Sequence, residues 1–156
     1  MEARLNPFGM ELGPKFAKHL IAANRALTES SLPLTTQELV KVRASQINGC
    51  AGCLDMHVKE AVAAGETAHR LALVAAWRDA NVFTDAERAA LELAEDGTRL
   101  ADAGDVSDEA WANAAEHYDE EQLLALVCVI ALINSFNRLN VITRQVGGDY
   151  QPGQHL

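Results

Sequence analysis

Basic residues are scarce in this chain of 156 residues. Its 13 Lys and Arg residues face 22 Asp and Glu residues, which gives a formal net charge of −9 at pH 7. A protein that binds nucleic acid needs a basic surface to displace the counterions of the phosphates, and docking on an anionic membrane needs a similar surface. The charge balance therefore predicts neither nucleic acid nor a membrane among the partners.

The sequence also lacks a targeting signal, a long hydrophobic run and a disulfide framework. Residues 1–7 have no basic start that leads into an apolar stretch. The longest apolar run, residues 123–133, has 11 residues, whereas a helix that spans a bilayer needs roughly 20. Three cysteines are too few for a disulfide-rich fold. We therefore expect a cytoplasmic protein with reduced thiols, folded as a single domain over residues 1–156.

The residues that are abundant favour helices. The chain contains 27 Ala and 19 Leu, which are strong helix formers, and no alternating segment indicates a strand. This pattern predicts an all-α fold of about seven helices, with an irregular tail over residues 146–156. Candidate helix caps are Thr35 or Thr36, Thr67, Thr84 with Glu87, Ser107 and Asp119, and candidate helix ends are Gly49 and Gly65.

Two of the three cysteines form a CxxC pair, Cys50 and Cys53, where one predicted helix ends and the next begins. The N-terminus of a helix offers free backbone N–H groups and the positive end of its dipole. Both stabilise a thiolate, and thiolates are the reactive form of cysteine. His57 follows Cys53 by four residues and so lies on the same helix face. An imidazole there can accept the thiol proton and later return it to a leaving oxygen.

A carboxylate, Glu38, completes a candidate proton relay. Glu38 lies about ten residues before the turn, or ~15 Å along its helix, and His57 lies roughly 11–12 Å beyond the turn. If the two helices pack as an antiparallel hairpin, the two side chains reach a similar height. Glu38 could then orient His57 and hold it in the required protonation state.

These residues resemble the core motif of a known family. Glu38, Cys50, Cys53 and His57, within the segment 46–57 (Gln-Ile-Asn-Gly-Cys-Ala-Gly-Cys-Leu-Asp-Met-His), are similar to the motif of the carboxymuconolactone decarboxylase superfamily, in its alkylhydroperoxidase D (AhpD)-like branch. Residues 131–140 (Ala-Leu-Ile-Asn-Ser-Phe-Asn-Arg-Leu-Asn) are similar to a later helix of that family. The resemblance covers residues 14–145.

The resemblance implies a thiol-dependent peroxidase that assembles as a homotrimer or homohexamer and needs no metal or organic cofactor. Cys53 would be the peroxidatic thiol, Cys50 the resolving thiol, and His57 with Glu38 the proton relay. The implied partners are a hydroperoxide and a dithiol reductant, either a lipoyl-bearing or a thioredoxin-like protein. The branch often has His or Tyr where this chain has Gly52, so a polar contact near the thiols is missing. Lactone decarboxylation is not expected, because the decarboxylases do not depend on a CxxC pair.

Three alternatives use the same residues differently. Cys50, Cys53 and His57, with Glu38 as a fourth ligand, could bind a metal ion. The cysteine pair could instead serve a thiol–disulfide oxidoreductase, or a redox sensor without peroxidase activity. In the third alternative the chain is an interaction module and its thiols are idle.

The remaining polar and aromatic residues receive structural predictions. Cys128 lies inside the apolar run, and we expect a buried core thiol there. Residues 123–133 are hydrophobic nearly all round, which suggests burial on every side, as in the centre of an oligomer. Trp77 and Trp111 are predicted to be core or subunit-interface anchors. On the helix of residues 131–140, polar side chains either line the site or tie subunits together: Asn134, Asn137, Arg138 and Asn140. Surface positions are predicted for His19, His69 and His117, and a place in the tail for His155.

Overall fold

The computed structural model of the protein describes residues 2–154, and within that range the regular elements are all helices. These residues form eight α-helices and two short 3-10 helices. The count of α-helices exceeds the expected seven by the short helix that follows α5, and the expected helix from Thr67 is divided into an α-helical and a 3-10 piece. In chain order the elements are η1 (Pro7–Gly9), α1 (Leu12–Thr28), α2 (Leu34–Asn48), α3 (Ala51–Ala63), α4 (Ala68–Leu73), η2 (Val74–Asp79), α5 (Asp85–Thr98), α6 (Leu100–Ala103), α7 (Asp108–His117) and α8 (Glu120–Thr143).

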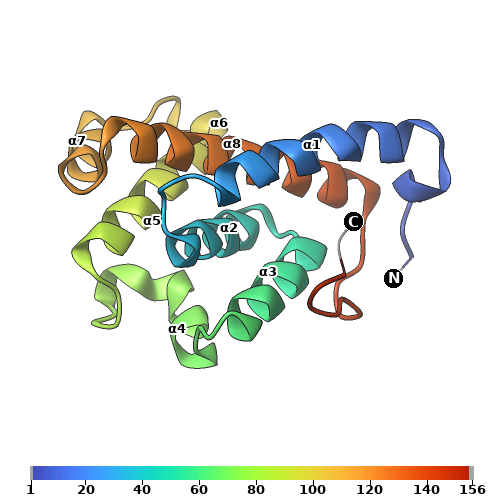
Figure 1. Ribbon diagram of the computed structural model, residues 1–156, viewed down its shortest axis with the longest axis horizontal. Coiled ribbons are helices and arrows are strands. Elements are labelled where there is room, and N and C mark those ends of the chain that lie inside the picture. The colour runs from blue at the N-terminus through green and yellow to red at the C-terminus, as the bar shows by residue number, and fades with distance from the viewer. Residues whose placement is uncertain (1, 155–156) are drawn as a thin grey trace.

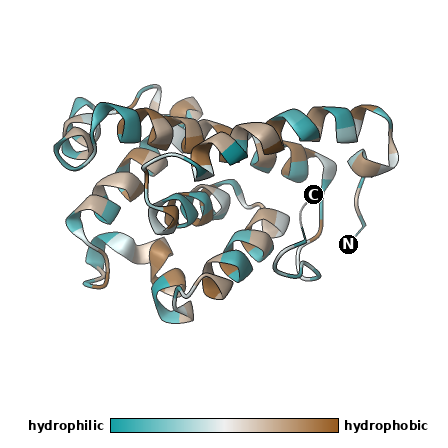
Figure 2. Cartoon of the chain, in the orientation of Figure 1, coloured by the Kyte–Doolittle hydropathy of each residue, from teal (hydrophilic) through white to brown (hydrophobic). Residues whose placement is uncertain are grey.

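The central helix is α2, which packs against α3, α5 and α8. Figure 1 shows α8 and α1 running side by side along one edge of the molecule, with α2 beneath them and α3 and α4 beyond it. Hydrophilic and hydrophobic residues alternate along most helices in Figure 2, as expected for helices with one buried face. Because α2 is enclosed by its neighbours, polar side chains on α2 are buried along with the apolar ones.

Helix caps follow the sequence prediction at most positions. The side chains of Thr67 and Ser107 accept hydrogen bonds from the backbone N–H groups of the first turns of α4 and α7. Thr84 with Glu87 forms the predicted capping box, and Asp119 caps α8. The prediction of Thr35 or Thr36 as a cap was wrong, because α2 begins earlier, at Leu34, directly after the N-cap residue Pro33.

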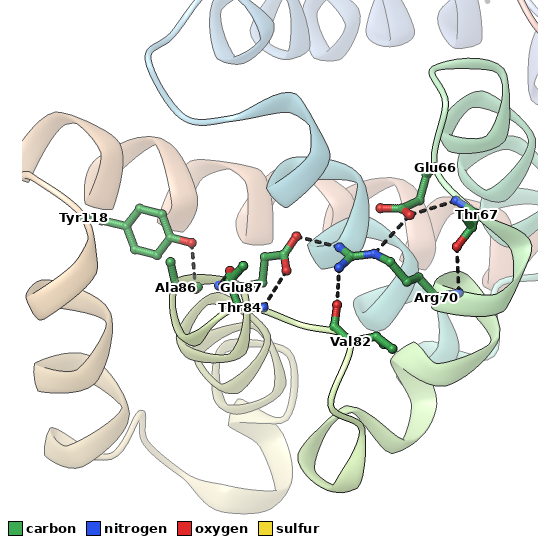
Figure 3. A network of polar contacts seen from close by, with 8 residues as sticks. All are labelled: Glu66, Thr67, Arg70, Val82, Thr84, Ala86, Glu87 and Tyr118. Atoms are coloured by element: carbon green, nitrogen blue, oxygen red, sulfur yellow. Dashed lines mark hydrogen bonds and ion pairs between the residues drawn. The ribbon is translucent and has the colours of Figure 1, made fainter.

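An arginine network fixes the turn between α3 and α4 against the start of α5 (Figure 3). The Arg70 guanidinium lies between the carboxylates of Glu66, at 3.1 Å, and Glu87, at 2.6 Å. It also donates to the backbone carbonyl oxygen of Val82. Because Glu87 belongs to the capping box of α5, this network links α4 directly to the first turn of α5. The η2 segment that follows α4 packs on α2, the helix that carries Glu38.

The long helix α8 is packed on one face only. Within residues 2–154 it is the single helix that is long and apolar enough, by length and composition, to cross a membrane. It instead packs on α1, α2 and α5, as a core helix does. Its opposite face is exposed within the chain: Leu124 is 58% exposed, and Cys128 is exposed too. The predictions of a buried Cys128 and of burial all round residues 123–133 were therefore wrong for the single chain.

The two tryptophans differ in their surroundings. Trp77 is a core residue whose indole N–H donates to a carboxylate oxygen of Glu95 at 2.9 Å. Trp111 is 46% exposed, so it is no core anchor of this chain. The predicted surface positions of three histidines are confirmed, because His19, His69 and His117 are exposed. The fourth, His155, lies outside the described residues.

Candidate active site

The CxxC pair occupies the junction between α2 and α3. Gly49 ends α2 with a left-handed backbone (φ 65°), a conformation that a glycine adopts without the steric cost of a Cβ atom. Cys50 is the N-cap of α3, and its Sγ accepts a hydrogen bond from the backbone N–H of Cys53 at 3.3 Å. The two sulfurs are joined in a disulfide, with their Cα atoms 5.4 Å apart. The turn therefore places a redox-capable pair at the positive end of a helix dipole.

The structure brings Glu38 and His57 together. Oε2 of Glu38 on α2 lies 2.9 Å from Nδ1 of His57 on α3. With Nδ1–H directed at the carboxylate, the second ring nitrogen, Nε2, is left to exchange a proton. His57 follows Cys53 by one helical turn, so the cysteine pair and the ring share a face of α3. Glu38 reaches this face from the neighbouring helix, as the spacing along the two helices predicts.

Sequence reasoning missed a third member of this cluster, Lys41. Its Nζ lies 2.8 Å from Oε1 of Glu38, and its side chain is 6% exposed. A buried ammonium is costly unless it is paired, and within residues 2–154 Glu38 is the partner of Lys41. The signal that could have found it is the three-residue spacing from Glu38 on one helix, which places both side chains on the same face.

Glu38 is strongly held in its ionised form. Burial by itself would raise the pKa of this carboxyl, because it disfavours the charged form. The hydrogen bond from His57 and the charge of the protonated His57 ring, followed by the charge and hydrogen bond of Lys41, outweigh burial and lower the pKa of Glu38 from 4.5 to about 2. Glu38 is thus a carboxylate at every physiological pH.

A helix distant in the sequence supplies a hydrogen-bond donor to the cysteine pair. The side-chain Nδ2 of Asn140 on α8 lies 3.3 Å from Sγ of Cys53. When the disulfide is reduced, this amide can donate to a Cys53 thiolate and stabilise its charge. Asn140 therefore lines the candidate site, which is one of the two places that the sequence left open for it.

The other asparagines of α8 tie that helix to the end of α2. The Asn48 amide donates to the side-chain oxygens of Asn134 and Asn137, both at 2.9 Å. Asn137 in turn donates to the hydroxyl of Ser45 at 3.0 Å, and Arg138 donates to the Asn134 side chain. These bonds lie within one chain and fix α8 against the helix that ends at the CxxC turn. They hold Asn140 in register with Cys53.

The C-terminal segment, residues 146–151, lies over the start of α3. The Asp55 carboxylate accepts hydrogen bonds from the backbone N–H groups of Gly148, at 2.7 Å, and Tyr150, at 3.0 Å. Lys59 donates to the carbonyl oxygens of the same two residues. The pKa of Asp55 is lowered chiefly by its bond to Lys59, with further contributions from the two backbone bonds. The expected irregular tail thus docks on its own chain, and residues 146–154 form no helix or strand.

The C-terminal segment also lies in the space next to Gly52. A Cβ atom at Gly147 would lie 2.4 Å from the carbonyl oxygen of Ala51, so the two backbones are in direct contact. A Cβ atom at Gly52 would point toward the carbonyl oxygen of Val146, at 3.8 Å. A His or Tyr side chain at position 52 would extend toward the C-terminal segment. The bare backbone at Gly52 therefore fits the closed position of residues 146–151.

Access to the disulfide is narrow. Cys50 and Cys53 are 1% and 2% exposed. A small pocket of about 160 Å³ reaches Cys50 between the CxxC turn and the end of α8, and it has one cationic lining residue, Arg144. Within the described part of the chain, no group of three or more His, Cys, Asp or Glu side chains is arranged to hold a metal ion.

Comparison with known proteins places this site in a family. The sequence model of the carboxymuconolactone decarboxylase family matches residues 14–96, which include Glu38, Cys50, Cys53 and His57. The Bacillus subtilis protein YdfG is 42% identical over 131 residues, which make up 84% of this chain and 88% of YdfG.

Solved structures agree with this relationship. A protein of unknown function from Agrobacterium tumefaciens, for which a role as the antioxidant defence protein AhpD has been suggested, superposes with a TM-score of 0.87 at 32% identity, over 96% of this chain and 100% of that one. The debrominase Bmp8 shares the fold at 18% identity, with a TM-score of 0.78 over 87% of this chain and 73% of Bmp8. The chain belongs to the carboxymuconolactone decarboxylase family, in its AhpD-like branch.

Proposed function

We propose that the protein is a thiol-dependent peroxidase that reduces hydroperoxides through Cys50 and Cys53. The observation that carries this proposal is a disulfide-forming CxxC pair at a helix N-terminus, followed one turn later by a histidine bonded to an ionised carboxylate. A nucleophile, a base and a group that orients the base are the components of an activated thiol. Family membership and the similarity to the Agrobacterium protein support an antioxidant role.

The proposed cycle begins with the reduced pair. Nε2 of His57 takes the proton of Cys53, and Asn140 donates a hydrogen bond to the resulting thiolate. The thiolate attacks the terminal oxygen of the hydroperoxide, the O–O bond breaks, and the alkoxide leaves as an alcohol with the proton from His57. Cys53 is now a sulfenic acid. The Cys50 sulfur attacks the sulfenic sulfur, the S–O bond breaks, the hydroxide leaves as water with the proton that the Cys50 thiol gives up, and the disulfide seen in the structure forms.

An external dithiol closes the cycle. It reduces the disulfide by two exchange steps and is itself oxidised to a disulfide. The family resemblance points to a lipoyl-bearing or thioredoxin-like donor and to a homotrimer or homohexamer. The expected location is the cytoplasm. The exposed apolar face of α8 and the half-exposed Trp111 are surfaces that such an assembly could cover.

The test is peroxide consumption with several dithiol donors. Cys53→Ser should abolish turnover, and Cys50→Ser should stop turnover after one sulfenic acid per chain has formed. Cys128→Ser is the matched control, because Cys128 is exposed on α8 and forms no disulfide. This variant should consume peroxide as the wild type does. Equal peroxide reduction by the parent and Cys53→Ser would refute the proposal.

One observation favours a second function, thiol–disulfide exchange without peroxide. The pocket reaches Cys50, and the backbone N–H of Cys53 donates to the Cys50 sulfur. Both features suit attack by a partner thiol on Cys50. The same assay separates the two functions: an exchange enzyme cycles its disulfide with dithiols and disulfides and leaves the hydroperoxide unchanged.

A further inference from the structure

Lys41, the buried lysine beside Glu38, has no role in the proposed peroxidase cycle. The Lys41 ammonium donates to Oε1 of Glu38, while His57 uses Oε2 of the same carboxylate. One anionic group therefore serves two groups that can carry positive charge. All three side chains are largely buried, so their charges are weakly screened by solvent.

The charge of Lys41 affects which protonation state of His57 the site favours. A buried Glu–His pair alone favours the imidazolium, because the carboxylate then gains a full ion pair. An imidazolium has no lone pair and cannot accept the proton of a thiol. With Lys41 already neutralising Glu38, a second positive charge on the ring is disfavoured, whereas a neutral ring still donates Nδ1–H to Oε2.

Other charged groups on the surrounding elements have partners of their own or lie at the pocket. On α3 and in the C-terminal segment, the Glu60 carboxylate is bonded by the Tyr150 hydroxyl and by the backbone of Gly153. The side chain that α8 directs at the cysteine pair is the neutral Asn140, and Arg144 at the end of α8 lines the pocket at Cys50. The other cations of the packed helices are paired: Arg43 of α2 with Glu95, Lys59 of α3 with Asp55, Arg70 of α4 with Glu66 and Glu87, and Arg138 of α8 with Asn134. Lys41 is thus the cation in direct contact with the relay.

We propose that Lys41 is a positioning residue which fixes the charge of Glu38, so that His57 works as a neutral base with Nε2 free for the proton of Cys53. This role rests on the proposed peroxidase function, because it assigns the state in which the base meets the thiol. Lys41 itself touches neither the cysteines nor the substrate.

The first test needs no variant. The ¹⁵N shifts of the His57 ring are measured in the oxidised wild-type protein slightly above neutral pH. The proposal predicts a neutral ring protonated at Nδ1 and bare at Nε2. A ring protonated at both nitrogens at that pH would overturn it, whatever the activity of the enzyme.

The second test removes the ammonium. At the same pH, Lys41→Met should raise the fraction of His57 rings that are protonated at both nitrogens and should slow the single-turnover peroxide reaction. Lys41→Arg should restore both values. An unchanged protonation state of the ring in folded Lys41→Met, or in Lys41→Gln if Lys41→Met fails to fold, refutes the role of Lys41. A wild-type protein that consumes no peroxide refutes the proposed function alone.

Discussion

Replacing Glu38 with Gln should reduce the loss of unfolding free energy that the protein suffers as the pH falls below neutral. The folded chain holds the pKa of this carboxyl at about 2 against an ordinary value of 4.5. At about 1.4 kcal/mol per pH unit, the difference corresponds to about 3 kcal/mol of stability. Because the folded-state pKa is the lower one, this stability is fully present above about pH 4.5 and is lost as the pH falls toward 2. Near pH 3, about 2 kcal/mol of it should be gone.

The assay is urea unfolding of the oxidised protein, followed by circular dichroism near pH 6 and near pH 3. Between these values the wild type should lose about 2 kcal/mol more than Glu38→Gln, which has no carboxyl at this position to titrate. The exposed carboxylate of Glu29 on the surface of α1 provides the control, and Glu29→Gln should follow the wild type. Equal losses in the wild type and Glu38→Gln would show that Glu38 is not held ionised by its neighbours.

The same variant tests the pairing with Lys41. Near pH 6, Glu38→Gln leaves a buried ammonium without its carboxylate, which should cost about 3 kcal/mol. The double variant Glu38→Gln/Lys41→Met should be more stable than Glu38→Gln, because the orphaned charge is gone. A double variant less stable than Glu38→Gln would contradict the buried ion pair.

Two further predictions concern the cysteine turn. The first variant is Asn140→Leu in a Cys50→Ser background. It should raise the pH at which the Cys53 thiolate forms by about one unit, because one charge-assisted hydrogen bond is lost. The thiolate is followed by its ultraviolet absorbance, and an unchanged thiolate titration would argue against this contact. The second variant, Gly147→Ala, places a Cβ atom 2.4 Å from a backbone carbonyl oxygen of the CxxC turn. It should displace the C-terminal segment and speed reduction of the disulfide by a phosphine several-fold. Gly52→Ala meets only ordinary contacts and should not change this rate. Equal reduction rates in the two variants would mean that the segment does not restrict access to the disulfide.

Local features of the sequence predicted the helices and the spacing within the site. The capping box at Thr84 and the glycine after α2 depend on hydrogen bonds between near neighbours, so they are readable from a few residues. The approach of Glu38 to His57 follows from the helical rise on both sides of a short turn. The prediction of Thr35 or Thr36 as a cap failed because α2 begins at Leu34, one residue before Thr35 and two before Thr36, with Pro33 as the N-cap.

The features that sequence reasoning missed depend on packing between distant segments. Asn140 lies 87 residues from Cys53, and no local pattern indicates that its amide reaches that sulfur. The burial of Lys41 follows from the enclosure of α2 by three helices, which its own sequence does not encode. Cys128 was misplaced because an apolar helix can leave one face uncovered within its chain, and hydrophobicity alone does not tell which face is packed.

The most direct test of the peroxidase mechanism is a single turnover without any external donor. The fully reduced protein is mixed with one equivalent of an organic hydroperoxide, and peroxide loss and intact mass are followed together. The account predicts that one peroxide is consumed for each Cys50–Cys53 disulfide formed, and that Cys50→Ser stops at a chain heavier by one oxygen atom on Cys53. A disulfide that forms at the same rate with and without peroxide, or peroxide loss that persists in Cys53→Ser, would contradict it.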